Sequence, residues 1–262
     1  MKKTIGRIYI LIIMLFLYLP ILTLIVLSFN DAKSMSVWTG FSLHWYAELF
    51  QSRLMMGAIV NTFSIAILAA TIATIVGTLA VLGMSAMKPR QENTLMAFNN
   101  IPMLNADIVT GIALMLFFLM IHWPRGYMSI LFSHTTFCIP YVILSVKPRL
   151  NKNTDRLFEA ALDLGASEKY AFRKIVIPEL KPGIMSGFLL SFTMSVDDFI
   201  ITYFTRGAGI NTISTLIYSE VKIGIRPSLF ALSTIIFVVA LVVLIIVNVR
   251  QKRADRMMTA GA

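Results

Sequence analysis

The chain alternates between long apolar stretches and short segments that are crowded with charges. The four stretches that contain no Asp, Glu, Lys or Arg are 8–29, 54–87, 126–146 and 228–249. Two further stretches are almost as apolar, since 93–121 carries one acid and 183–205 carries two. A helix needs about 20 apolar residues to cross the roughly 30 Å hydrocarbon core of a membrane, and each stretch is long enough.

This pattern predicts an all-α membrane protein with six transmembrane helices. We expect a single transmembrane domain over residues 1–262, with spans at about 8–29, 58–84, 95–121, 126–146, 183–205 and 228–249. Helices are favoured over a β-barrel because the segments are continuously apolar instead of alternating. The first segment is longer than a signal-peptide core and no small-x-small cleavage site follows it, so we expect a membrane anchor.

Composition and charge support the membrane assignment and predict the orientation. Hydrophobic residues make up 57% of the chain, charged residues 14%, and the mean hydropathy is +0.79, which excludes an ordinary soluble domain. Most of the 23 basic residues lie before the first span, after the second and fourth spans, and after the last. The positive-inside rule therefore predicts that both termini and the fourth loop are cytoplasmic. The net charge of +10 has this origin and does not indicate nucleic-acid binding.

The fourth loop, residues 150–182, has the pattern of two short helices. The first helix is amphipathic, and Gly165 is expected to end it in the left-handed conformation. We expect Pro178 and Pro182 to stop the second helix before the fifth span begins. From the pattern alone, the loop is equally compatible with an amphipathic hairpin that rests on lipid headgroups.

Acidic residues inside two of the spans are the main candidates for a functional site. Asp107 lies in the third span, and Asp197 and Asp198 lie in the fifth. At about 1.5 Å per residue, these acids fall at similar depth in the outer half of the bilayer. Unpaired carboxylates are costly in hydrocarbon and mark pathways or functional sites. The alternative is that they pair with a basic residue of a partner subunit.

The sequence around these acids favours an opened helix and a cationic solute. Asn105 and Pro102 precede Asp107, and Ser195 precedes the acidic pair, so the backbone there is expected to open toward a cavity. Trp45 is expected in a short interfacial helix over 43–50, where its ring can offer a face to ammonium groups. Anchoring at the membrane interface is the alternative role for this tryptophan.

No catalytic or metal-binding constellation is predicted. The single Cys138 excludes an intramolecular disulfide, and His44, His122 and His134 are scattered. The sequence G-x-x-x-x-G-K-[ST] does not occur, so we expect no P-loop and no ATP hydrolysis in this chain.

The fourth loop resembles the EAA loop of ABC-importer permeases, whose pattern is E-A-A-x3-G-x9-I-x-[LI]-P. The residues that occupy its fixed positions are Glu159, Ala160, Ala161, Gly165, Ile175, Ile177 and Pro178. The resemblance implies a permease whose loop inserts a short helix into a groove of a separate ATPase. The small alanine side chains then allow close docking.

Four longer segments resemble the spermidine/putrescine permeases of the PotC type: 131–140, 159–168, 191–198 and 217–222. This resemblance implies the type I ABC importer fold in the cytoplasmic (inner) membrane. The implied partners are an ATPase homodimer, a second related permease and an extracytoplasmic polyamine-binding protein. No cofactor is implied in this chain, since ATP and Mg²⁺ are bound by the ATPase. The residues implied for the polyamine pathway are Asp107, Asp197, Asp198, Trp45 and Ser195.

Three other functions remain open from the sequence. One is a permease of the same family that carries another solute, such as an anion or a metal chelate. Another is a cation-coupled secondary transporter that uses the intramembrane acids as a proton or cation site. The third is a membrane scaffold without transport activity, which leaves the matched depth of the acids unexplained.

Overall fold

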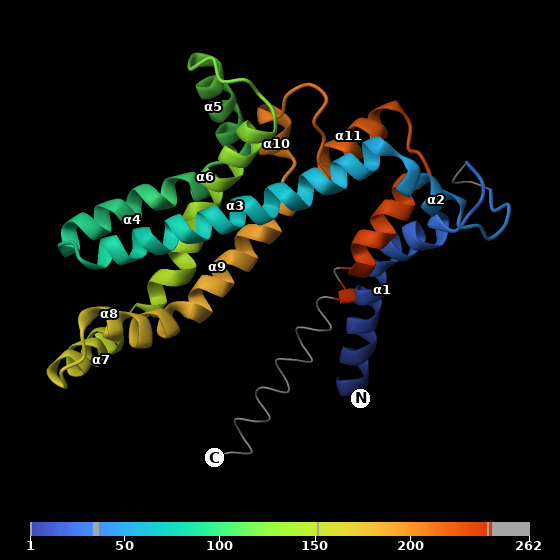
Figure 1. Ribbon diagram of the computed structural model, residues 1–262. Coiled ribbons are helices and arrows are strands. Elements are labelled where there is room, and N and C mark those ends of the chain that lie inside the picture. Colours follow the sequence, from blue (N-terminus) through green and yellow to red (C-terminus); the bar gives the residue numbers. More distant parts are fainter. Residues whose placement is uncertain (1, 34–36, 151, 240, 243–262) are drawn as a thin grey trace. The chain divides into compact units, whose positions relative to one another are not determined.

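The computed structural model describes residues 2–33, 37–150, 152–239 and 241–242, and this part of the chain is built from helices (Figure 1). Its elements are α1 (Lys2–Ser28), α2 (His44–Gln51), α3 (Arg53–Ser85), α4 (Pro89–Leu104), α5 (Asp107–Met120), α6 (Tyr127–Val146), the 3₁₀ turn η1 (Lys147–Arg149), α7 (Lys152–Asp163), α8 (Glu168–Ala171), the π-helical turn η2 (Phe172–Val176), α9 (Ile177–Asp197), α10 (Ile200–Thr205) and α11 (Ile213–Ile223). The all-α prediction is confirmed, since the described residues add only an isolated β-bridge between Asn30 and Phe41.

The chain divides into two compact units, which are described separately. One unit combines the two ends of the chain, Met1–Met56 and Ile217–Ala262, and contains α1 and α2. The other is Gly57–Leu216, and it contains the helices from α4 to α10. The prediction of a single transmembrane domain stays a prediction.

Four helices are long and apolar enough to cross a membrane, and the number is five if the bent pair α4 and α5 is counted as one span. The four are Gly6–Ser28, Arg53–Ser85, Tyr127–Arg149 and Glu168–Asp197. Of the predicted sixth span, 228–249, the structure describes an apolar helix over Ser228–Val239, and the rest of that span lies outside the described residues except 241–242. The count of six and the side on which the termini lie therefore stay predictions.

Two of the predicted spans, 95–121 and 183–205, are interrupted. The first is split into α4 and α5, whose axes meet at 102°. Asn105 and Ala106 at the break are extended, with ψ of 147° and 137°, which helical residues do not adopt. The second span ends its long helix at Asp197 and resumes as the short α10 at Ile200. The opened backbone that the polar residues before Asp107 predict is therefore present.

Small residues bring α3 and α9 close to α6. Ala66, Ala70 and Ala73 of α3 are fully buried. A Cβ atom at Gly77 of α3 would lie 2.7 Å from Cγ1 of Val142 in α6. A Cβ atom at Gly187 of α9 would lie 3.2 Å from Cα of the same valine. Backbones that approach this closely pack well without a hydrophobic driving force, which lipid does not supply.

The helix after the fourth loop does not stop at its prolines, contrary to prediction. Helical backbone runs from Glu168 to Asp197, and Pro178 and Pro182 lie within it. A proline ring clashes with the carbonyl group four residues earlier, and for Pro178 this residue is Lys174. Lys174 lies in the π-helical turn η2, where the wider winding relieves that clash. The fifth span therefore continues directly from α8.

Within the larger unit, the helices of the fourth loop lie at the opposite end of α6 from α5 and α10 (Figure 1). An ion pair between Lys147 in η1 and Glu92 in α4 anchors the loop end of α6. The hydroxyl of Ser129, at the other end of α6, donates to the carbonyl of Thr205 at 2.8 Å. A single helix thus connects the two polar regions of this unit.

Candidate functional site

A cavity of about 440 Å³ lies where the two interrupted spans meet α6. The residues that line it are Pro102, Asp107, Thr110, Phe137, Tyr141, Thr193, Met194, Asp197, Asp198, Phe199, Ile200 and Ile201. The three acids that were predicted from two separate spans therefore share one cavity. Its wall also carries three aromatic rings, those of Phe137, Tyr141 and Phe199.

Asp107 and Asp197 are exposed at this cavity. Asp107 is the first residue of α5, and Asp197 is the last residue of α9. Within the described part of the chain, neither carboxylate makes a hydrogen bond or an ion pair. Both remain available to a cationic ligand.

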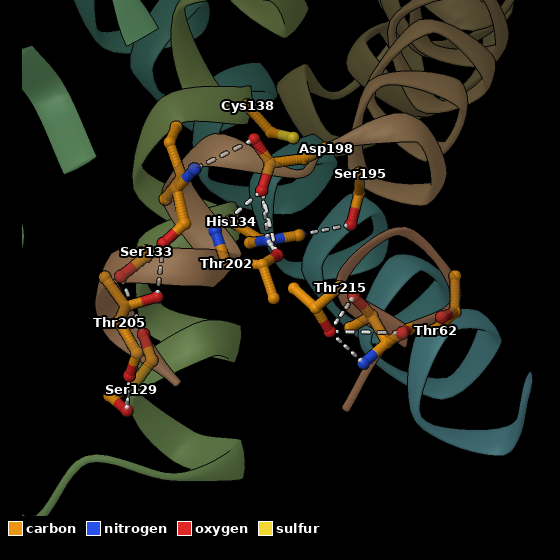
Figure 2. A network of polar contacts seen from close by, with 12 residues as sticks. Thr62, Ser129, Ser133, His134, Cys138, Ser195, Asp198, Thr202, Thr205 and Thr215 are labelled. Carbon is orange, nitrogen blue, oxygen red and sulfur yellow. Dashed lines mark hydrogen bonds and ion pairs between the residues drawn. The ribbon is translucent and has the colours of Figure 1, made fainter. Parts of the chain in front are cut away.

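Asp198 lines the same cavity but is occupied by the protein itself (Figure 2). Its side chain is only 9% exposed. Oδ1 accepts the backbone N–H of Ile201 at 3.2 Å, and Oδ2 accepts both the N–H and the hydroxyl of Thr202 at 2.8 Å. Nε2 of His134 lies 3.3 Å from Oδ2. The carboxylate therefore caps α10, because it binds backbone N–H groups in its first turn.

Ser195 is buried one helical turn before this acid and does not line the cavity. Its hydroxyl lies 2.7 Å from Nδ1 of His134, and Nε2 of the same ring lies 2.9 Å from the hydroxyl of Thr202. His134 is 1% exposed and links α6 to both sides of the break between α9 and α10. In the sequence this histidine is one of three scattered ones, because its partners lie more than 60 residues away along the chain.

Trp45 belongs to the other unit, in the short helix α2 that the sequence predicts there. The side chain is 4% exposed, and its indole Nε1–H donates to the carbonyl of Asn30 at 2.6 Å. Tyr46, its neighbour, bonds the hydroxyl of Ser28 at 2.7 Å. These contacts fix α2 against the end of α1, and a role of Trp45 in the substrate pathway stays a prediction.

The fourth loop forms a second polar region with a defined turn. Gly165 follows α7 with a φ of +87°, as predicted, and no atom lies within 4 Å of the position of a Cβ. Its N–H donates to the carbonyl of Leu162 at 2.9 Å, and the N–H of Ala166 donates to that of Ala161 at 3.0 Å. This pair of bonds is the Schellman motif, and the left-handed residue in it favours glycine.

Apolar side chains project from this loop. Leu164 is 90% exposed, and Leu157 and Tyr170 are also exposed. Glu159 and Ala160 are exposed on α7, Ala161 is half-buried, and further along the chain Ile175 is half-buried and Pro178 exposed. An exposed apolar group of this kind fits a helix that docks on another protein or on lipid.

No group of three potential metal ligands occurs among the residues that the structure describes. The cavity itself offers carboxylates and aromatic rings.

The interrupted spans, the acidic cavity and the helical loop define a membrane permease, and the sequence agrees. Residues 73–256 match the family described as the binding-protein-dependent transport system inner membrane component, and the chain belongs to this family. Its members are membrane components of import systems that work with a binding protein.

The chain is also similar to individual permeases and to a solved transporter structure. The chain is 38% identical to the "spermidine/putrescine transport system permease protein PotC" of Haemophilus influenzae over 88% of this chain and 90% of that protein. It is 39% identical to the "putrescine transport system permease protein PotI" of Escherichia coli K12 over 84% and 81%. Among solved structures, a bacterial ABC transporter for the import of alginate matches with a TM-score of 0.74 at 15% identity, over 96% of this chain and 95% of that one, which shows the shared fold.

Proposed function

We propose that this chain is a permease subunit of an ATP-driven importer that moves polyamines, spermidine or putrescine, across the cytoplasmic membrane. The observation that carries the proposal is the convergence of Asp107 and Asp197 on one cavity, each without a partner in the described part of the chain. The relatives that match over most of the chain transport spermidine and putrescine, which supports the same solutes here.

The chemistry of the cavity fits a flexible polycation. The two free carboxylates can each bind a terminal ammonium group through charge-assisted hydrogen bonds. The methylene chain between the ammonium groups can lie against Phe137, Tyr141 and Phe199, whose ring faces also attract cations. An anion would meet repulsion from all three acids, and a metal chelate has no need of the aromatic wall.

The family implies that the chain works as part of a larger machine. We propose an ATPase homodimer on the cytoplasmic side, a second related permease beside this chain, and an extracytoplasmic polyamine-binding protein. ATP and Mg²⁺ are bound by the ATPase, and this chain holds no cofactor. Both termini and the fourth loop are cytoplasmic in this arrangement, as the distribution of basic residues predicts.

The fourth loop is the proposed contact with the ATPase. The residues assigned to this contact are Glu159, Ala160, Ala161, Gly165, Ile175 and Pro178. The exposed Leu164 and Tyr170 supply apolar area for docking. Closure of the ATPase dimer moves α7 and α8, and α6, which reaches from this loop to α10, carries the movement to the cavity as a rigid element.

The experiment that tests the proposal is uptake of radiolabelled spermidine by the complete transporter in liposomes, with ATP inside. We expect the double variant D107N/D197N to take up polyamine at least about tenfold more slowly, since each lost charge pair is worth about 1 kcal/mol or more. The control is D31N, which removes an exposed acid that lies outside the cavity.

Normal uptake by the double variant contradicts the assignment of Asp107 and Asp197 to the substrate pathway. Uptake that proceeds without the ATPase supports the secondary transporter instead. Uptake of a different solute, with none of either polyamine, supports another cargo within the same family.

A further inference from the structure

His134 forms the centre of a buried hydrogen-bonded chain whose direction can be assigned atom by atom (Figure 2). The hydroxyl of Thr202 donates its only proton to Oδ2 of Asp198. It must therefore accept a hydrogen bond from Nε2–H of His134, which lies 2.9 Å away. In a neutral ring the other nitrogen, Nδ1, then accepts the hydroxyl proton of Ser195 at 2.7 Å. The donors thus run in one direction, from Ser195 through His134 and Thr202 to Asp198.

The hydrogen-bonded chain crosses the interruption in the fifth span. Ser195 is on α9, Asp198 is in the break, and Thr202 is on α10. His134, on α6, is the only one of the four that comes from another span. Its ring therefore holds the end of one helix and the beginning of the next at fixed positions.

The same helix holds α10 at its other end. Ser129 of α6 donates to the carbonyl of Thr205, the last residue of α10. Side chains of α6 thus contact this six-residue helix at both ends. A helix this short is not stable alone, so its position depends on such tertiary contacts.

We propose that His134 is a positioning residue of the transport pathway, and that Asp198 and Ser195 act through it and not on the solute. Asp107 and Asp197 are then the carboxylates that meet the polyamine. The proposal rests on the proposed function, because it divides the acids of that cavity into two that bind and one that holds the cavity wall.

A role for His134 as a proton carrier fits the geometry less well. Both ring nitrogens are engaged by protein atoms, and the side chain is 1% exposed. A ring that exchanges protons directly with water or the solute needs one nitrogen in contact with them, whereas a positioning ring has both nitrogens bonded to protein atoms.

The first test compares two replacements of the ring in the liposome uptake assay. Glutamine offers a donor group, its NH₂, and an acceptor, its carbonyl oxygen, where the neutral imidazole offers one N–H and one acceptor nitrogen, whereas leucine offers neither. We expect H134Q to keep uptake within about threefold of the wild type, and H134L to lower it about tenfold or more, since unpaired buried hydroxyls cost about 1–3 kcal/mol. Equal losses in the two variants contradict positioning by hydrogen bonds.

The second test uses a pair of serines on the same face of α9, one helical turn apart. Ser195 bonds the ring, whereas the hydroxyl of Ser191 is buried with no hydrogen-bond partner in the described part of the chain. We expect S195A to lower uptake about threefold and S191A to leave it unchanged. If S195A acts through His134, the double variant H134L/S195A is no slower than H134L alone. Multiplicative losses, or equal effects of the two alanines, overturn the proposal.

A wild-type transporter that takes up no polyamine contradicts the proposed function but leaves the hydrogen-bonded chain open to test. The thermal midpoint of the purified complex then tests whether the hydrogen-bonded chain stabilises the protein. A lower midpoint for H134L than for H134Q, and for S195A than for S191A, supports the chain, and equal midpoints within each pair refute it.

Discussion

Two membrane spans are interrupted at the same cavity, and the two breaks are built differently. Where α4 gives way to α5, Asp107 is exposed and no side-chain hydrogen bond caps the new helix. Where α9 gives way to α10, Asp198 is buried and accepts three hydrogen bonds from the first residues of α10. The first break presents its acid to the cavity, and the second uses its acid to hold the backbone.

An acid within a membrane span has no fixed role. Such residues are costly in lipid and are retained for function, but the function can be either binding or support. The number of donors around the carboxylate decides between them. Asp197 and Asp198 are neighbours in sequence, yet only the second has its oxygen atoms occupied by protein donors in the described part of the chain.

The largest effect is expected from removing the charge at the second break. D198N places an amide NH₂ against the N–H and hydroxyl donors of Thr202, which leaves buried donors unpaired. We expect a loss of about 3 kcal/mol in stability, seen as a lower thermal midpoint of the purified transporter. D107N is the matched variant at the first break, and its change should stay within about 0.5 kcal/mol. Similar thermal midpoints for D198N and D107N would contradict the claim that only the second break depends on its acid for stability.

A smaller effect is expected where the two breaks touch. α5 packs on α10 at Gly111, where a Cβ would lie 3.1 Å from Cδ2 of Phe204 and 3.5 Å from Cα of Ile201. G111V forces the two helices apart and should cost about 2 kcal/mol, together with loss of uptake. G83V is the control, because no atom lies within 4 Å of a Cβ at that glycine. A harmless G111V indicates that the helices can separate without affecting the cavity.

The smallest effect is expected far from both breaks, in the fourth loop. G165A puts a Cβ on a residue with a φ of +87°, which costs about 1 kcal/mol although the surrounding space is open. We expect the G165A transporter to move fewer polyamines per ATP hydrolysed than the wild type. G57A, at a helical glycine that also has open space, should behave as the wild type. An unchanged ratio in G165A argues against a role of this turn in coupling.

Much of the fold follows from local features of the sequence. Uncharged stretches of span length predict the helices. Gly165 predicts the end of α7 because the Schellman motif depends on a single residue with positive φ. Asn105 and Pro102 indicate an opened backbone before Asp107, and the break lies there.

The remaining features depend on contacts between distant segments. The sequence presents Asp197 and Asp198 as equivalent, and it does not show that His134 approaches Asp198 from α6. Pro178 and Pro182 are strong stop signals locally, but the helix continues through both. The π-helical turn η2 relieves the clash of Pro178 with the carbonyl of Lys174. For Trp45, the sequence leaves two roles open. The structure adds a contact that the sequence does not predict, the hydrogen bond from its indole N–H to the carbonyl of Asn30.

The sharp bend between α4 and α5 also has an electrostatic consequence. It turns the amino-terminal end of α5, a helix of 14 residues, toward the acidic cavity. The backbone dipoles of such a helix add up to about half a positive charge at that end, which offsets part of the negative charge of Asp107. A cation that enters therefore meets a shallower electrostatic well than three carboxylates alone would create. A transport pathway needs this moderation, since a solute held too tightly is never released.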